Sequence, residues 1–240
     1  VSPRRTPGAC VADMPIAYLC DFDGTISPRD IGAAFAERFS PAGASARVPE
    51  LGEWLEGRIG HRTLTRAQCA HVRAREDEAL AFTRGFRLDP RFAPFVREAL
   101  GRGDAVMVVS EGFDFYLRDH LVREGLGDLP WAANHLVFRE DGGVSPEFPF
   151  ADPTCDDCGN CKAQHVRRYR SYGYFTVLVG DGASDRHGAL AADAVLARGH
   201  LREWCVEQGV AHEAVNDFGD VAEYARRQER IATRDRGSRT

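Results

Sequence analysis

The sequence predicts an α/β fold, an open parallel Rossmann-like sheet with an inserted helical cap. Short, continuous apolar runs recur along the chain, as in strands that are covered on both faces of a parallel sheet. Stretches with helical patterning separate most of these runs. Residues 30–85 interrupt the alternation, because they contain no convincing strand. In an open parallel sheet, the ligand crevice lies at the carboxyl ends of the strands.

The expected elements follow in order along the chain. Asp89 and Pro90 suit the N-cap and the first position of a helix. Asp141-Gly142-Gly143 suits the turn of a small hairpin between residues 136–138 and Val144. We expect strands at 16–20, 105–109, 176–179 and 194–197, and helices at 90–100, 113–123, 161–170, 184–191 and 200–208.

The interruption at residues 30–85 predicts a separate helical cap, with helices at 30–39, 49–56 and 64–80. A catalytic core then consists of residues 14–29 and 86–225. The two ends, 1–13 and 226–240, have no apolar periodicity, and we expect them to be flexible.

Composition excludes several classes of protein. The 240 residues carry a net charge of −5, whereas a nucleic-acid binder is usually strongly basic. No apolar run approaches the roughly 20 residues of a membrane span. The run at 16–20 is also too short for a secretory signal. We therefore expect a cytoplasmic protein without a nucleic-acid or membrane partner, while its oligomeric state is left open.

Four acidic residues follow two of the expected strands. Asp21 and Asp23 come directly after the first strand, and Asp181 and Asp185 come after the strand at 176–179. Because the ends of parallel strands converge, these carboxylates would repel one another unless a cation lay between them. Mg²⁺ binds carboxylate oxygens together with water and substrate phosphate. The sequence thus predicts a magnesium site.

A phosphate group at this site would need donors and positive charge. Ser110 and the backbone amides of Glu111 and Gly112 follow the second strand and could supply donors. Lys162 could supply the charge, and it is the only lysine among 31 basic residues. Its presence is either chance or the sign of a position where a planar guanidinium would not fit.

Four segments together resemble the signature motifs of the haloacid dehalogenase superfamily. They are DFDGTIS at 21–27, VVSEG at 108–112, CK at 161–162 and VGDGASD at 179–185. An acid two residues after the first aspartate is typical of its phosphatase branch, and a helical cap between the first two motifs is similar to the phosphoserine-phosphatase-like subgroup. The segments at 88–96, 155–162 and 195–205 also resemble 2-hydroxy-3-keto-5-methylthiopentenyl-1-phosphate phosphatases of methionine salvage.

The resemblance implies a role for each core residue. Asp21 would be the nucleophile that forms an aspartyl-phosphate, and Asp23 would act as general acid and then as general base. Ser110 and Lys162 would bind the transferring phosphoryl group. The metal would be held by Asp21, Asp23, Asp181 and Asp185.

Three cysteines form a C-x₂-C-x₂-C pattern directly before Lys162. Cys155, Cys158 and Cys161 could bind Zn²⁺, with a fourth ligand from His135, His165 or Cys205. The alternative is a tight turn of buried thiols that positions Lys162.

Four further residues are candidates for contact with the substrate. Trp54, Arg58 and Arg62 belong to a polar and aromatic cluster in the expected cap, and Phe22 lies between the two aspartates of the first motif. Each of them could equally have a structural role.

The function that these observations favour is a Mg²⁺-dependent phosphomonoester hydrolase that acts on a small phosphorylated metabolite through an aspartyl-phosphate. Among single substrates, the enol phosphate of methionine salvage comes first. Two alternatives stay open: a phosphotransferase or phosphomutase of the same superfamily, and a zinc or redox module on the same scaffold.

Overall fold

The computed structural model describes residues 14–41 and 48–237, without the side chains of Leu55 and of residues 231–237. The predicted flexible end at 1–13 and Cys10 lie outside these residues. The chain divides into two compact units. Within the described residues, the first unit contains 14–21, 89–107 and 162–237, and the second contains 22–88 and 108–161.

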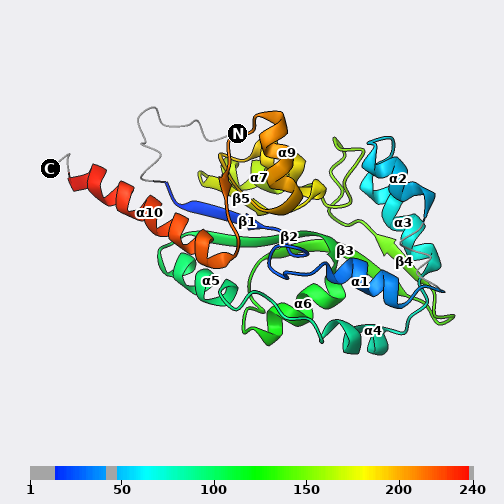
Figure 1. Cartoon of the computed structure of the whole chain (residues 1–240). Coiled ribbons are helices and arrows are strands. Elements are labelled where there is room, and N and C mark those ends of the chain that lie inside the picture. The colour runs from blue at the N-terminus through cyan, green and yellow to red at the C-terminus, as the bar shows by residue number, and fades with distance from the viewer. Residues whose placement is uncertain (1–13, 42–47, 238–240) are drawn as a thin grey trace. The chain divides into compact units, whose positions relative to one another are not determined.

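The first unit contains a parallel sheet of four strands in the order β1-β5-β6-β7. Figure 1 labels β1 and β5 of this sheet. The strands are β1 (Ile16–Cys20), β5 (Phe175–Gly180), β6 (Ala194–Ala197) and β7 (Glu213–Ala214). Apolar side chains fill most positions of the first three strands, with Thr176 of β5 as a polar exception, and nearly all of these residues are buried. Both faces of this part of the sheet are therefore covered, as the sequence predicts.

Helices complete the first unit. Helix α7 (Lys162–Ser171) packs on β1 and β5, and α9 (Gly199–Gln208) packs on β6. A 3₁₀ turn at Ala183–Asp185 leads into α8 (Arg186–Ala191), and α5 (Phe92–Gly101) packs against α10 (Phe218–Gly237). Asp89 joins these last two helices, because its carboxylate accepts the backbone N–H groups of Arg91 at 2.8 Å and Phe218 at 2.8 Å.

In the second unit, three strands pair with one another. Strand β2 (Ala105–Phe113) begins in the first unit and continues into the second, where it runs parallel to β3 (Trp131–Phe138). Strand β4 (Val144–Glu147) returns antiparallel to β3, which confirms the hairpin. The helices are α1 (Ile31–Arg38), α2 (Pro49–Leu55), α3 (His61–His71), α4 (Glu76–Thr83) and α6 (Asp114–Arg123).

Both units combine helices with parallel strands, so the α/β class is confirmed. All four predicted strands are present, and the described residues of 30–85 form helices without a strand. The division into core and cap stays a prediction, because the second compact unit holds α1 to α4 together with β3 and β4.

Three predicted features differ from the structure. Helix α5 begins at Phe92 with Arg91 as its N-cap, so Asp89 does not have the predicted capping position and instead accepts the Arg91 N–H group before the helix. The helix expected at 64–80 is divided between α3 and α4, because Val72 leaves helical geometry and Arg73 pairs with Gly143 of the hairpin turn. Residues 226–237, expected in a flexible end, continue α10. Ion pairs from Arg226 to Glu98 and from Arg227 to Glu213 hold part of this helix.

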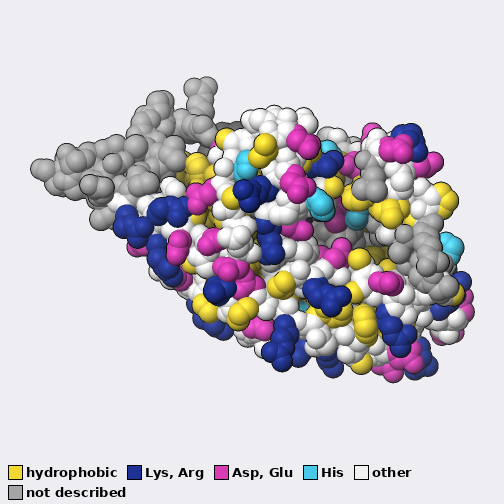
Figure 2. Space-filling view, viewed as in Figure 1, with side chains coloured by type: hydrophobic (Ala, Val, Ile, Leu, Met, Phe, Trp, Pro, Cys, Tyr) yellow, Lys and Arg dark blue, Asp and Glu magenta, His cyan; other side chains and the backbone are white. Residues whose placement is uncertain are grey.

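Figure 2 shows one face of the molecule. On the face drawn in Figure 2, basic and acidic side chains are interspersed. Among the described helices, none combines the length and apolar character needed to cross a membrane.

Candidate active site

Three carboxyl groups meet in the first unit. Asp21 follows β1 and Asp181 follows β5, and these neighbouring parallel strands pair Cys20 with Val179. The Asp21 N–H donates to the Val179 carbonyl at 2.9 Å, which continues the strand pairing by one residue. Asp21, Asp181 and Asp185 each offer a carboxylate oxygen, and these oxygens lie within 4.8 Å of one another. The predicted acidic cluster is therefore present for these three residues.

Lys162 is the cation of this cluster. It begins α7 and its side chain is fully buried. Its Nζ lies 2.8 Å from Asp21 Oδ1 and also forms an ion pair with Asp185. Burial lowers the pKa of Lys162, but the two carboxylates outweigh this effect and raise it above the usual value. Lys162 therefore stays positively charged between two acids.

Asp185 holds the loop after β5 in place. Its second oxygen accepts the N–H groups of Asp181 at 3.0 Å and Gly182 at 2.9 Å. Gly180 is required beside it, because a Cβ atom at that position would clash with the Asp185 carboxylate. Lys162 and the loop thus occupy both oxygens of this buried side chain, which gives Asp185 a positioning role.

Negative charge exceeds positive charge at this cluster. Burial and the charge of Asp185 raise the pKa of Asp21, and Lys162 offsets part of that rise. A divalent cation would offset more of it and keep Asp21 ionised. Three carboxylates within reach of one another also match the oxygen ligands that Mg²⁺ prefers. The residues present fit a magnesium ion.

Asp23 belongs to the second unit, where both of its oxygens accept hydrogen bonds. Oδ1 accepts the Ile31 N–H at 2.8 Å, and Oδ2 accepts the Tyr116 hydroxyl at 2.6 Å. Burial, followed by the charge of Asp30, raises the pKa of Asp23 to about 7, and these hydrogen bonds oppose the rise. A carboxyl group with such a pKa can both give and accept a proton near neutral pH.

Tyr116 is a site residue that the sequence reasoning missed. It lies on α6, 93 positions from Asp23, and its side chain is fully buried. Burial, followed by Asp23, raises the pKa of its hydroxyl well above the usual value, so the hydroxyl stays protonated and donates. No motif marks this residue, because the interaction depends on how distant segments fold together.

Ser110 and Gly112 lie on β2 beside this pair. The Gly112 N–H donates to Ser110 Oγ at 2.9 Å. A side chain at position 112 would clash with the Tyr116 hydroxyl and with Asp23, so the glycine is a steric requirement. Asn160 donates to the Ser110 carbonyl at 2.9 Å. The second unit therefore brings Asp23, Ser110 and Gly112 together, as predicted.

The Glu111 side chain contacts other parts of the second unit. Its Oε2 accepts the Gly159 N–H at 3.0 Å and lies 3.1 Å from Nδ1 of His61. The predicted donor at this position is the backbone N–H group, so these side-chain contacts leave that prediction untested.

The predicted substrate contacts fall into two groups. Trp54 is half-buried with its ring 5.5 Å from that of His61, and Arg58 is exposed and pairs with Glu56. Both stay predictions. Arg62 instead donates to the Cys155 carbonyl at 2.9 Å, and Phe22 is fully buried among aromatic rings, so both have clear structural roles.

Comparison with known proteins agrees with this geometry. Residues 18–190 match the family described as haloacid dehalogenase-like hydrolase. A 2-hydroxy-3-keto-5-methylthiopentenyl-1-phosphate phosphatase from Brevibacillus brevis is 30% identical over 209 residues, covering 86% of this chain and 93% of the relative. A protein of the same name from an Exiguobacterium species is 32% identical, covering 88% of this chain and 97% of the relative.

Solved structures show the same fold. A substrate-bound phosphoserine phosphatase superposes with a TM-score of 0.65 at 19% identity, covering 88% of this chain and 98% of the other. A phospho-aspartyl intermediate analogue of phosphoserine phosphatase gives a TM-score of 0.65 at 21% identity, with 88% and 99% covered.

Proposed function

Because this chain belongs to the haloacid dehalogenase-like hydrolases and is a phosphatase of small phosphorylated metabolites, we propose that it is a Mg²⁺-dependent phosphomonoesterase working through an aspartyl-phosphate on Asp21. The observation that carries the proposal is the buried Lys162, which pairs with Asp21 and Asp185 while Asp181 adds a third carboxylate. One ammonium among three acids suits a site for a metal and a phosphate.

In the first half of the reaction, a carboxylate oxygen of Asp21 attacks the phosphorus atom of the substrate. A bond forms between Asp21 and phosphorus, and the ester P–O bond breaks. The departing alkoxide takes its proton from Asp23, which is two residues along the chain and whose pKa of about 7 suits a proton donor. Tyr116 and the Ile31 N–H group hold the Asp23 carboxyl during the transfer.

In the second half, water attacks the phosphorus atom of the aspartyl-phosphate. The bond between phosphorus and Asp21 breaks, which releases inorganic phosphate and restores the carboxylate. Asp23, now ionised, accepts a proton from the attacking water. One residue therefore serves both halves of the reaction.

Lys162 and Ser110 bind the phosphoryl group in this scheme. The Lys162 ammonium reduces the repulsion between the ionised Asp21 and an anionic substrate, and Ser110 hydrogen-bonds a phosphoryl oxygen. Asp21 and Asp181 would hold Mg²⁺, with the Asp23 carbonyl as a further ligand. When bound, the metal would neutralise negative charge that develops on the phosphoryl oxygens. Asp185 would act through Lys162 and the loop after β5.

We expect chelation to abolish activity. Protein dialysed against EDTA should release no phosphate, because Lys162 alone cannot balance the carboxylates and an incoming phosphate. Mg²⁺ should restore turnover, whereas Ca²⁺ should inhibit, because it favours more ligands and longer distances. Phosphate release at increasing metal concentration measures both effects. Full activity after exhaustive chelation would contradict the proposed metal dependence.

The relatives support a specific substrate. We propose 2-hydroxy-3-keto-5-methylthiopentenyl-1-phosphate, the compound named in both relatives, as the preferred substrate. In a panel with phosphoserine and sugar phosphates, its kcat/KM should exceed the others by about 10-fold or more. Phosphate release from every good substrate would also argue against a mutase. A better rate with phosphoserine would reject the enol phosphate while leaving the phosphatase intact.

Trp54 and Arg58 remain the proposed contacts with the body of the substrate. Both side chains reach the surface of the second unit, although Arg58 also pairs with Glu56. We leave Phe22 and Arg62 out of this set because of the contacts described above.

Tyr116→Phe should change the pH dependence of the reaction. The hydroxyl stabilises the ionised form of Asp23, so its removal should raise the Asp23 pKa further above about 7. The first step needs protonated Asp23, so the fall of kcat/KM at high pH should move to higher pH. We expect kcat to drop by less than the roughly 10²–10⁴-fold that complete loss of a general acid costs.

The pH profile separates this role from a purely structural one. A variant that has only lost packing would show a lower rate or a lower melting temperature with an unshifted profile. That result, or a shift to lower pH, would contradict the assignment of Tyr116.

A further inference from the structure

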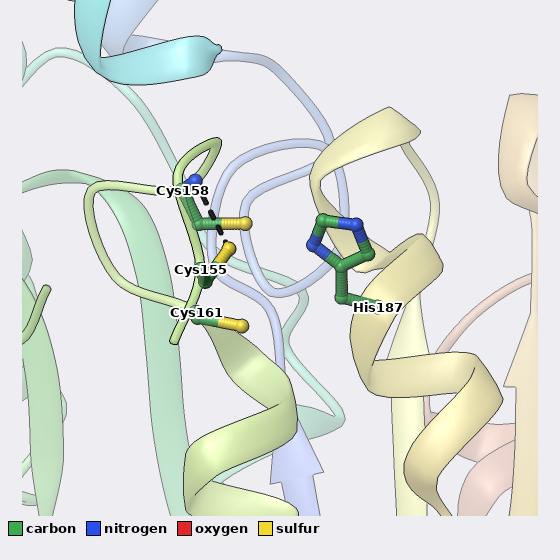
Figure 3. A group of neighbouring side chains, drawn as sticks. All are labelled: Cys155, Cys158, Cys161 and His187. Atoms are coloured by element: carbon green, nitrogen blue, oxygen red, sulfur yellow. Dashed lines mark hydrogen bonds between the residues drawn. The ribbon is translucent and has the colours of Figure 1, made fainter. Parts of the chain in front are cut away.

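The three cysteines of the second unit lie close together in one irregular loop. Cys155, Cys158 and Cys161 belong to the segment between β4 and α7, and their sulfur atoms lie within 4.8 Å of one another (Figure 3). Cys158 and Cys161 are each only 3% exposed. The Cys158 N–H donates to Cys155 Sγ at 3.4 Å. The described cysteines form no disulfide.

The loop has no regular secondary structure and few apolar side chains. Residues 151–161 contain no helix or strand, and apart from the cysteines their only apolar residues are Ala151 and Pro153. A long irregular segment without a core of its own needs another source of order. Tetrahedral Zn²⁺ with bonds of about 2.3 Å to sulfur places its sulfur ligands roughly 3.8 Å apart, which small side-chain movements would satisfy here.

The loop in turn holds residues of the proposed active site. Asn160 donates to the Ser110 carbonyl, and the Gly159 N–H donates to the Glu111 side chain. The Asp157 carboxylate accepts the His61 N–H at 2.8 Å at the start of α3. The order of this loop therefore affects both the end of β2 and helix α3.

The same loop contacts α3 through its backbone. Arg62 reaches the Cys155 carbonyl, and Gly60 packs so closely on the backbone of Asp156 and Asp157 that a Cβ atom there would clash. Contacts this close require the loop to keep one conformation. Three neighbouring thiols offer a metal clip that would enforce it.

We propose that Cys155, Cys158 and Cys161 bind a structural Zn²⁺ ion that is separate from the catalytic magnesium. Structural zinc takes four ligands, so the fourth must come from elsewhere in the chain. The sequence offers His135, His165 and Cys205 as candidates for this ligand. His135 contacts Asp114 instead, with 2.6 Å between its Nδ1 and the carboxylate.

The test is the metal content of the full-length protein. Elemental analysis after dialysis against EDTA, under conditions that remove Mg²⁺, should find roughly one zinc per chain. Cys158→Ser should lose it, whereas Cys69→Ser, which changes a buried cysteine of α3 outside the loop, should retain it. Replacing zinc by Co²⁺ should give the near-ultraviolet absorption of cobalt bound to thiolates.

Wild-type protein provides the decisive measurement if Cys158→Ser does not fold. Its zinc can be released with a mercurial reagent and recorded with a chromogenic chelator, without reference to activity. Folded wild-type protein that holds no zinc and takes up neither Zn²⁺ nor Co²⁺ would overturn the proposal.

Discussion

Asp21→Asn should reduce phosphate release by about 10⁴-fold or more while the protein stays folded. An amide oxygen is neutral and a poor nucleophile, so the aspartyl-phosphate would not form. The fold should survive, because Lys162 keeps its ion pair with Asp185 and the substitution removes one of three neighbouring acids. Melting temperature and phosphate release with the preferred substrate measure the two effects separately.

Two further variants sharpen this prediction. Asp21→Ala should be equally inactive, and it excludes residual turnover caused by slow deamidation of asparagine back to aspartate. Asp119→Asn is the matched control. Asp119 lies on α6, pairs with Arg84 and has no role in the proposed reaction, so this variant should keep the full rate. Substantial turnover by Asp21→Ala would remove Asp21 as the nucleophile.

The sequence was most informative where one residue type repeats along a short segment. Continuous apolar runs predicted β1 and β6 with their correct bounds, because strands buried on both faces need apolar side chains at every position. The sequence also predicted that Asp21, Asp181 and Asp185 lie together, because neighbouring parallel strands end at a common edge of the sheet.

The sequence was least informative where distant segments interact. The break between α3 and α4 follows apolar residues that look helical, and its cause is a pairing of Arg73 with a turn 70 positions later. Tyr116 and Asp23 are likewise 93 positions apart. Helix α10 is not among the predicted helices, and beyond Arg226 its arginines look like a solvated tail until their partners Glu98 and Glu213 are known. Such contacts leave no local pattern.

Substitution of Lys162 should have the second large effect on activity and stability. Lys162→Ala should lower kcat by about 10²–10³-fold, because the phosphoryl group would lose the positive charge that we propose binds it. It should also cost about 3–5 kcal/mol of stability, because Asp21 and Asp185 would remain buried without their shared cation. Assays with excess Mg²⁺ and chemical denaturation without metal would measure the two losses independently.

The loss of stability should depend on pH in a defined direction. Burial and Asp185 already raise the pKa of Asp21, and removal of Lys162 would raise it further. The folded variant would then bind a proton more readily than the unfolded chain, so it becomes more stable relative to wild type as the pH falls through that raised pKa. A stability difference that grows on acidification would contradict the proposed role of the ion pairs.

Lys162→Arg tests whether the shape of the cation matters as much as its charge. The Nζ atom of Lys162 lies between two carboxylates, and the side chain is fully buried. Gly188 packs closely on this side chain, because a Cβ atom added to Gly188 would lie 2.9 Å from Lys162 Cβ. The longer, planar guanidinium cannot place one charge at the same point, so Lys162→Arg should lose nearly as much rate as Lys162→Ala. Arg226→Lys is the reverse exchange in an exposed pair and should change neither rate nor melting temperature appreciably. If Lys162→Arg keeps most of the wild-type rate, charge alone suffices, and the only lysine among 31 basic residues owes its presence to chance.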